Sequence, residues 1–374
     1  MPRLAHAAAV AAAVALLVAL TVRVEGAVTR EQVETAIRNG VRYLKEQQRA
    51  DGSWVDLSEE TPSGVTSLVT LALLTAGEPP NEPHVAKALD YLRGMTPERL
   101  GNTYSVGLQT MVFAAATPER DQLKIAANVA WLERAQIKPG ERVNWAGSWT
   151  YTEFKTRFGD NSNTQYALLG LNAAAEVGVP VKPEVWTLAR RYWEQQQHND
   201  GSWAYTPDAR TASTASMTCA GISSLVIAGL KRFQGQEYLS GSEIRDCGKG
   251  NVNVHLQRAT DWLARNFYVG QNVPSGQQFK YYYLYGLERA GRLTGQRFFG
   301  SHDWYREGAQ ELVIRQDKID GFWEGSQPYE NNRDVTTSCS LPRKGRAPCS
   351  STSSATARRV TGTTTRTTYG ISST

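Results

Sequence analysis

Two kinds of helical pattern alternate along the chain. In EQVETAIRNGVRYLKEQQ (31–48) apolar residues recur about every four positions, which is typical of an amphipathic helix with one buried face. That face contains Val33, Ile37, Val41 and Leu44. In PSGVTSLVTLALLTAGEPP (62–80) nearly every position is apolar or small up to the Gly77 and proline stop, which predicts a helix covered on all sides.

A repeated phrase joins the two helices of each unit. It reads EQQRADGSW at 46–54, NWAGSW at 144–149, QQQHNDGSWAY at 195–205 and VIRQDKIDGFW at 313–323. The glycine permits a tight turn, the tryptophan can pack at the joint, and the glutamine amide can reach backbone groups left unpaired at helix ends. We therefore predict a structural role for these residues: Gln48, Gly52, Trp54, Gly147, Trp149, Gln197, Gly201, Trp203, Gln316, Gly321 and Trp323.

Six turn aromatics space the units at intervals of about 50 residues. They are Trp54, Tyr104, Trp149, Trp203, Tyr268 and Trp323. Two helices per period indicate stacked helical hairpins, each of which needs its neighbours to cover its apolar second helix. An open stack would need polar caps at both ends, so the pattern favours an all-α ring of six hairpins, an (α/α)6 toroid with the apolar helices inside.

The predicted ring spans residues 28–338, and residues 1–27 differ from it in composition. The first segment has one early arginine, an apolar run and small residues near Gly26, which is typical of a secretory signal peptide. The alternative is an uncleaved membrane anchor, since residues 7–22 are nearly long enough to span a bilayer. We expect a secreted or periplasmic protein, with membrane anchoring by this segment as the alternative.

Helical patterning stops after Asp334, where the sixth inner helix is due. Residues 339–374 are rich in Ser, Thr and Arg, which is typical of a disordered tail. A frameshift is the alternative, because codons for Ser-Ser-Thr-Ser-Ser at 350–354 can encode Leu-Ile-Asn-Lys-Leu in another frame. The last inner helix is therefore expected to be missing or garbled.

The net charge of +5 belongs to the ends of the chain. Residues 339–374 contain six basic and no acidic residues, and residues 1–27 contain two basic and one acidic, which leaves −2 for residues 28–338. This near-neutral body offers no electrostatic basis for binding nucleic acid. The four cysteines lack zinc-binding spacing, so we expect no metal site; Cys219 is either paired with Cys247 or a buried free thiol.

The repeated Gln-x(2–5)-Gly-x-Trp phrase resembles the QW repeat of squalene and terpenoid cyclases, whose α/α toroid also occurs in protein prenyltransferase β subunits. The resemblance covers residues 30 to about 338 and includes PSGVTSLVTLALLTAG and NSNTQYALLGL. With the export signal and GSHDWYREGAQELV (300–313), the chain also resembles exported bacterial prenyltransferase-repeat proteins that carry a further C-terminal domain and have no assigned reaction.

Neither family's catalytic motif is complete in this chain. The resemblance to the cyclases implies an Asp-x-Asp-Asp acid motif, but the corresponding GDNSNT keeps only Asp160 and has Ser162 and Asn163 at the acid positions. The resemblance to zinc prenyltransferases implies an Asp, Cys and His set. Asp208 with Cys219, or Asp246 with Cys247, are the nearest candidates, and the expected histidine is absent from FKYYYLYGLERAG. We therefore expect no metal and no cofactor.

Candidate site residues follow the aromatic turns, where the inner helices begin and their N-termini converge on one mouth. Helix N-termini favour anions, so a diphosphate or carboxylate is an expected ligand there. Three carboxylates are candidate catalytic groups across the mouth: Asp160, Asp208 and Asp334. Candidate cavity residues are Asn161, Asn163, Arg210, Lys280, Tyr281, Tyr282 and Tyr285, although aromatic residues on a buried helix can also be simple core.

The main hypothesis is an exported toroid that binds a ligand or acts as a scaffold, without the complete motif of either enzyme family. Its expected partner is an apolar or sugar-like small ligand, or another protein, and membrane contact is expected only through an uncleaved signal anchor. The alternative hypothesis is an enzyme of cyclase, transferase or lyase type that acts on an isoprenoid, lipid or glycan with mouth carboxylates.

Overall fold

The computed structural model describes residues 28–58, 61–141, 145–154, 159–208, 210–233, 238–240, 243–245, 253–326, 330 and 332–341. The predicted signal segment, Asp246, Cys247 and most of the predicted tail lie outside these residues. Within them the chain is all-α apart from two short hairpins. None of the described helices is long and apolar enough to cross a membrane.

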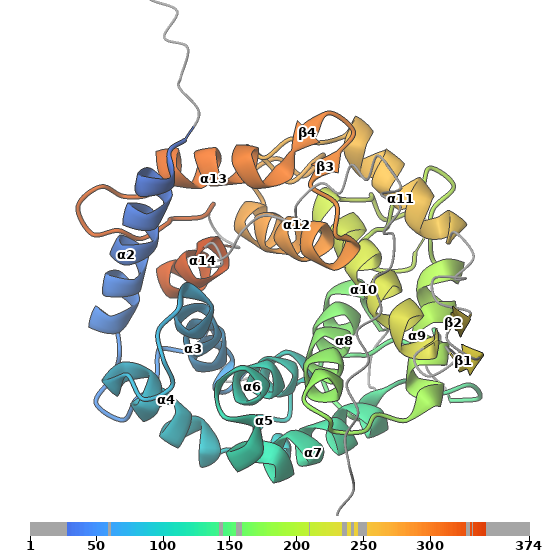
Figure 1. Cartoon of the computed structure of the whole chain (residues 1–374), viewed down its shortest axis with the longest axis horizontal. Helices are drawn as coiled ribbons and strands as arrows, with labels where there is room; N and C mark the ends of the chain where they lie inside the picture. Colours follow the sequence, from blue (N-terminus) through green and yellow to red (C-terminus); the bar gives the residue numbers. More distant parts are fainter. Residues whose placement is uncertain are drawn as a thin grey trace, which may run out of the picture.

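Inner and outer helices form two concentric rings (Figure 1). The outer ring contains α2 (Arg30–Glu46), α4 (Pro83–Arg93), α5 (Pro97–Leu100), α7 (Pro118–Ala135), α9 (Pro183–Gln195), α11 (Val254–Arg265) and α13 (Trp304–Arg315). The inner ring contains α3 (Gly64–Ala76), α6 (Thr103–Ala116), α8 (Asn161–Glu176), α10 (Ala215–Phe233), α12 (Lys280–Thr294) and α14 (Arg333–Ser340). The hairpins are β1 (Tyr238–Ser240) with β2 (Glu243–Arg245), and β3 (Phe298–Phe299) with β4 (His302–Asp303).

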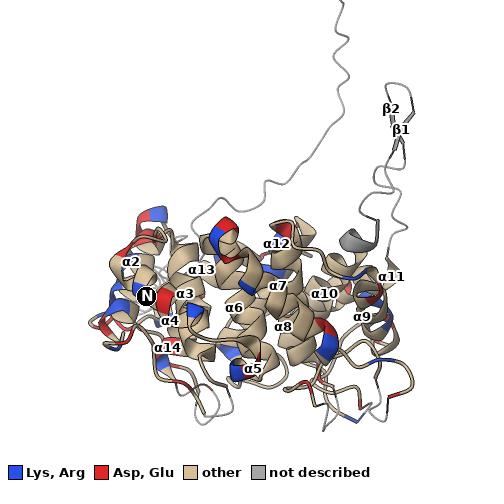
Figure 2. Ribbon diagram, turned by 90° about the horizontal axis from the view of Figure 1, so that it is seen from below, with Lys and Arg blue, Asp and Glu red and all other residues tan. Residues whose placement is uncertain are grey.

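The two sequence patterns separate into the two rings as predicted. On α2 the residues Val33, Val41 and Leu44 are buried, whereas α3 and α6 are buried along almost their whole length. Most charged residues accordingly lie on the outer helices and at helix ends, and the ribbons of the inner helices α6 and α8 are almost uncharged (Figure 2), whereas α12 carries Glu288 and Arg289 within its length. This burial supplies the main driving force for folding.

The ring is closed, which confirms the predicted toroid. Each inner helix packs against the next, and α14 packs against both α12 and α3. The prediction that helical structure stops after Asp334 was wrong, because α14 continues to Ser340. The sixth inner helix is present but short, with 8 residues against 13 in α3 and 15 in α12.

The repeated phrase builds a joint between consecutive hairpins, which we call the QW joint. Its glutamine Nε2 donates to the glycine carbonyl of its own turn and to a carbonyl on the next outer helix. For Gln48 these acceptors are Gly52 at 3.0 Å and His84 at 2.8 Å. Gln197 bonds Gly201 and His255 in the same way, and Gln316 bonds Gly321 and Ala36. The last pair links the sixth hairpin to the first and so closes the ring.

The tryptophan of each QW joint ties the outer helix to the inner one. Trp54 Nε1 donates to the Leu44 carbonyl at 2.8 Å, and its backbone N–H donates to Thr66 Oγ1 at 3.0 Å. The same two bonds recur at Trp149, Trp203 and Trp323, and all four rings are at most 1% exposed. The predicted structural role of these residues is thus visible in their contacts.

Sequence reasoning missed one glutamine of this set and misplaced two aromatics. Gln136 makes the third QW joint, with bonds to the carbonyls of Gly147 and Val185. Tyr104 is not a turn residue, because it lies in the first turn of α6, and Tyr268 is 54% exposed and not buried at a joint. The second and fifth units therefore lack the QW joint in the described residues.

Glycine is required at the joint for two reasons. At Gly147 φ is +100°, and an added Cβ would lie 2.2 Å from the carbonyl oxygen of Leu188 on α9. Gly140 also has a positive φ, +85°, but no described atom lies within 4 Å of its Cβ position. A side chain at Gly147 would therefore meet both backbone strain and steric overlap, whereas one at Gly140 would meet backbone strain alone.

We predict that Gly147→Ala lowers the free energy of unfolding by about 2–5 kcal/mol, because strain and overlap add. Gly140→Ala is the matched control and should cost about 1–2 kcal/mol, from strain alone. Urea unfolding followed by circular dichroism measures both. Equal losses would show that the approach of α9 to the joint does not require glycine.

Candidate functional site

The described inner helices all begin at the same mouth, and each has at least one N-terminal N–H that donates to a side chain of this protein. Asp56 accepts from Ser63 N and Val65 N at α3, at 2.8 and 3.3 Å, and Asn102 accepts from Tyr104 N at α6. Asn332 caps α14 through Val335 N. The chain's own side chains therefore compete with the anion that the sequence predicts at these termini.

Two further caps come from side chains of a neighbouring unit, and the sequence did not indicate them. Asn272 Oδ1 accepts from Ser216 N at the start of α10, at 2.9 Å. Glu330 Oε1 accepts from Tyr281 N and Tyr282 N at the start of α12, at 2.9 and 3.1 Å. Neither residue stands next to the helix it caps, so no local capping pattern indicates it.

Asp160 is the most deeply buried of the three candidate acids. As the N-cap of α8 it accepts from Asn163 N at 2.8 Å, from Ser162 Oγ at 2.6 Å and from Asn163 Nδ2 at 2.8 Å. Burial raises the pKa of this carboxyl, and the bonds from Ser162 and Asn163 oppose that rise because they favour the ionised form. Both oxygens are thus engaged by the helix they cap.

The other two candidate acids have separate surroundings. Asp208 forms an exposed pair with Arg210 at 2.9 Å, and the hydrogen bonds from Arg210 lower the pKa of the Asp208 carboxyl to about 2. Asp334 lies at the start of α14 and interacts with Tyr43 on the outer helix α2, while burial raises its pKa. Each of the three carboxyl groups therefore has its own partners, with no contact between them in the described residues.

The candidate cavity residues separate into three groups. Asn161 joins α8 to its neighbours through the Ala204 carbonyl at 2.6 Å and the Tyr192 hydroxyl at 2.8 Å. Lys280 and Tyr281 lie in a side cleft of about 360 Å³ beside α13, where Lys280 pairs with Glu311 at 3.1 Å. Tyr282 and Tyr285 contact Tyr166 of the inner helix α8, while Asn163 and Arg210 pair with Asp160 and Asp208 as described above.

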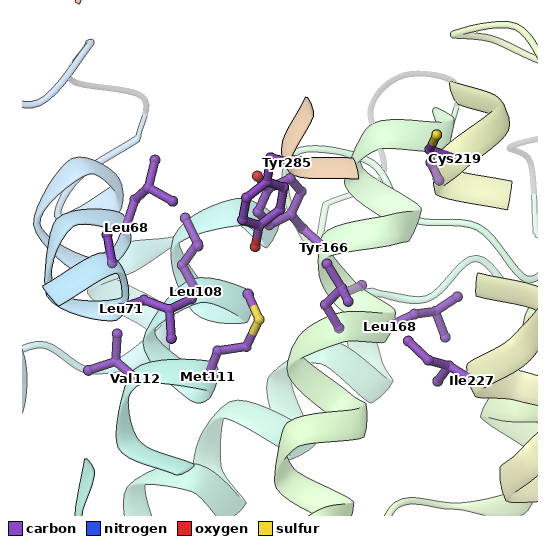
Figure 3. Packing of buried hydrophobic residues seen from close by; sticks show 14 of the residues in the cluster. Leu68, Leu71, Leu108, Met111, Val112, Tyr166, Leu168, Cys219, Ile227 and Tyr285 are labelled. Carbon is purple, nitrogen blue, oxygen red and sulfur yellow. The ribbon is translucent and has the colours of Figure 1, made fainter. Parts of the chain in front are cut away.

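Stacked tyrosines fill the centre of the ring. The Tyr166 ring lies 6.1 Å from Tyr285 with an interplanar angle of 2°, and 6.3 Å from Tyr282. Tyr104 packs against Tyr166 at 4.5 Å. Figure 3 shows the Tyr166 and Tyr285 rings overlapping between the apolar side chains of α6 and α8. Packed tyrosine rings therefore form part of the core inside the ring of helices.

Two further tyrosines extend this core to solvent. Tyr151 and Tyr205 stand two residues after Trp149 and Trp203, are 44% and 40% exposed, and share a hydroxyl–hydroxyl bond of 2.9 Å. The Tyr151 ring stacks on Tyr104 at 6.0 Å. We call Tyr104, Tyr151, Tyr205 and Tyr282 the tyrosine collar. Sequence reasoning overlooked three of its members as ligand contacts, although the Trp-x-Tyr pattern marks two.

The position of each exposed collar residue is set by the backbone. The Tyr151 carbonyl accepts from Thr103 N at the start of α6, and the Tyr205 carbonyl accepts from Asn161 N at the start of α8, at 2.8 and 3.0 Å. Asp160 and Ser162 lie next to the collar, since both influence the pKa of Tyr205, which burial raises first of all. Backbone hydrogen bonds at the mouth therefore hold the two exposed collar tyrosines in place.

The Glu330 carboxyl at the mouth titrates near neutral pH. It is 8% exposed, its Oε2 finds no hydrogen-bond partner among the described residues, and burial raises its pKa from 4.5 to about 7. Between these pH values the folded protein holds the proton more tightly than the unfolded chain does. The contribution of Glu330 to the free energy of unfolding therefore falls as pH rises through this window.

We predict that Glu330→Gln removes this pH-dependent loss of free energy of unfolding. Relative to the wild type, the variant should gain up to about 3 kcal/mol in free energy of unfolding between pH 4.5 and pH 7.5. Urea unfolding at several pH values measures the difference. Glu324→Gln, which removes an exposed carboxylate from the same loop, should show no comparable trend. A constant offset for Glu330→Gln across the range would contradict the prediction.

No protein-family model and no curated protein matches this chain. Solved structures do match. The type II terpene cyclase MstE from Scytonema, in its apo form, is 15% identical with a TM-score of 0.52, over 84% of this chain and 97% of that chain. An MstE variant in complex with the product merosterolic acid A gives 15% and 0.52, over 83% and 95%.

A further MstE variant, in complex with the substrate geranylgeranyl dihydroxybenzoate, gives 15% identity and a TM-score of 0.50 over 83% of this chain and 95% of that chain. At this level of identity the similarity concerns the fold. The resemblance inferred from the QW repeats is confirmed to that extent: this chain has the α/α fold of the terpenoid cyclases.

Proposed function

We propose that this protein binds an apolar, isoprenoid-like ligand at the tyrosine collar and does not cyclise it. The observation that carries the proposal is the collar itself, where partly exposed aromatic rings lead to the stacked pair of Tyr166 and Tyr285. Aromatic faces bind flat apolar groups, and their hydroxyls can orient a polar end. The geranylgeranyl ligand of the MstE variant supports this ligand class, through the shared fold alone.

The mouth does not favour acid catalysis. Ser162 and Asn163 occupy the positions where the cyclase resemblance implies acids, and both donate to Asp160. These bonds hold the Asp160 oxygens against their own helix, so the carboxyl is better explained as a cap. An enzyme that uses Asp160 remains the second candidate, because burial raises the pKa of this group as an acid catalyst requires.

We predict that Tyr151→Ala with Tyr205→Ala weakens farnesol binding at least about tenfold, because two stacking faces are lost. Isothermal titration measures farnesol, with maltose as the arm for a sugar-like ligand. Tyr91→Ala is the control, as Tyr91 lies on the outer helix α4. Equal affinity in the double variant, or maltose binding in place of farnesol, would contradict the proposal.

An Asp160 variant separates ligand binding from catalysis. Asparagine is also a good N-cap, so Asp160→Asn should keep the fold and the farnesol affinity while it removes the ionisable proton. Product analysis after incubation with geranylgeraniol is expected to show unchanged alcohol for both proteins. A cyclised product from the wild type that Asp160→Asn abolishes would establish the enzyme instead.

We also infer export through residues 1–27, on the strength of their composition alone. In a bacterial host that secretes proteins, the mature chain is expected to begin near residue 28 and to be found outside the cytoplasm. N-terminal sequencing of the purified protein measures this. An intact N-terminus in the membrane fraction would favour the anchor.

A further inference from the structure

The short sixth inner helix leaves a groove at the end of the ring opposite the mouth. α14 ends at Ser340, so among the described residues no inner helix continues between the C-terminal parts of α3 and α12. The groove is bounded by these helices and by α13. Its apolar wall includes Leu68, Leu71, Leu284, Leu287, Trp304 and Leu312.

A buried arginine lies in this apolar wall. Arg289 is 6% exposed; its Nη2 donates to the Tyr285 hydroxyl at 2.7 Å and its Nη1 to Glu288 Oε2 at 3.0 Å. Its Nε has no hydrogen-bond partner among the described residues. A buried N–H without an acceptor is unfavourable, and a guanidinium N–H is a strong donor. Because Arg289 lines the groove, its guanidinium gives this apolar wall a positive charge.

Among the described residues that line the groove, Arg289, Arg292 and Glu288 are charged, which leaves one positive charge in surplus. Arg292 stands at the rim with 42% of its side chain exposed, 3.4 Å from Glu288, so two arginines share one glutamate. A singly charged anion would balance the set. Apolar walls around such a charge suit a molecule with a hydrocarbon chain and an anionic head.

The size of the groove restricts that molecule further. Its cavity volume is about 80 Å³, counted as the space open to the centre of a water molecule. Since one water needs about 10–15 Å³ in this measure, the space holds roughly six waters. A short single chain fits this volume, and a two-chain lipid does not.

We propose that this groove binds a single-chain carboxylate lipid. The carboxylate pairs with Arg292 at the rim of the groove, beside the Arg289 guanidinium, and the chain lies along the leucines of α3 and α12. The groove shares no residue with the tyrosine collar, but it adjoins the stacked pair through Tyr285, which lines the groove and packs on Tyr166. Variants that act on one site alone therefore separate this proposal from the proposed function.

The probe is decanoate, added to the full chain and measured by isothermal titration and by thermal unfolding. Decanoate should raise the Tm with concentration, as expected for a ligand of the folded state. Decanol and decyltrimethylammonium have the same chain without the anion and should bind at least about tenfold more weakly, because the two arginines recognise charge. Equal binding of decanol and decanoate would overturn the proposal.

Gly308 on α13 allows the groove to be closed without disturbing the fold. It lines the groove, and no described atom lies within 4 Å of its Cβ position. Gly308→Leu therefore puts a side chain into the open space and also improves helix propensity. Gly229→Leu is the matched control, since Gly229 is equally open and α10 does not line the groove.

Gly308→Leu should weaken decanoate binding at least about tenfold, while Gly229→Leu leaves it unchanged. Arg292→Gln should weaken it about threefold to tenfold, through the loss of one charge at the rim. Both glycine variants should bind farnesol at the collar like the wild type, so failure at one site is distinguishable from failure at the other. Unchanged decanoate affinity in Gly308→Leu would show that the groove is not the site.

Discussion

The ring depends on one hydrogen-bonding arrangement, in which a glutamine amide joins two carbonyls from consecutive units. An amide Nε2 has two hydrogens, and at Gln316 one donates to Gly321 and the other to Ala36 on the first outer helix. Both bonds are buried, so the loss of either would leave a carbonyl without its donor. The joint therefore holds consecutive units together at four of the six positions, including the one that closes the ring. Glycine and tryptophan complete it: the glycine lets the next outer helix approach, and the tryptophan ties the inner helix to its own outer partner.

Closure determines what the mouth can contain. Six helix N-termini meet there, and each brings unpaired N–H groups and a partial positive charge. The chain satisfies the described groups internally, with carboxylates at three positions (Asp56, Asp160 and Glu330) and amides or hydroxyls at the others. Burial raises the pKa of each of these carboxyl groups. The same residues that could serve as acids are thus committed to holding the ring together, which explains why buried carboxyls here are weak grounds for catalysis.

The fold could be predicted from the sequence because its determinants are local and repeated. Gln48, Gly52 and Trp54 stand within seven residues, and their spacing recurs. The site could not be predicted to the same extent, because its determinants are distant. Glu330 caps α12 and Asn272 caps α10, and each belongs to a different unit from the helix it caps. Tyr104 was misassigned because its position in the period is that of a turn aromatic, whereas helix α6 begins one residue before it and turns its ring toward Tyr166.

A ring of this kind can change its chemistry without changing its architecture, since the residues of the QW joints and those of the interior are different. At α8 the positions of the cyclase acids are filled by Ser162 and Asn163, which serve the cap of the same helix. In the centre, Tyr166 of α8 stacks on Tyr285 of α12. Beside the short α14, buried Arg289 and several leucines line a groove. Each of these changes is confined to one inner helix or its turn. Because the QW joints hold the outer ring independently of these interior residues, such changes alter what the ring can bind while the closure between Gln316 and Ala36 is preserved.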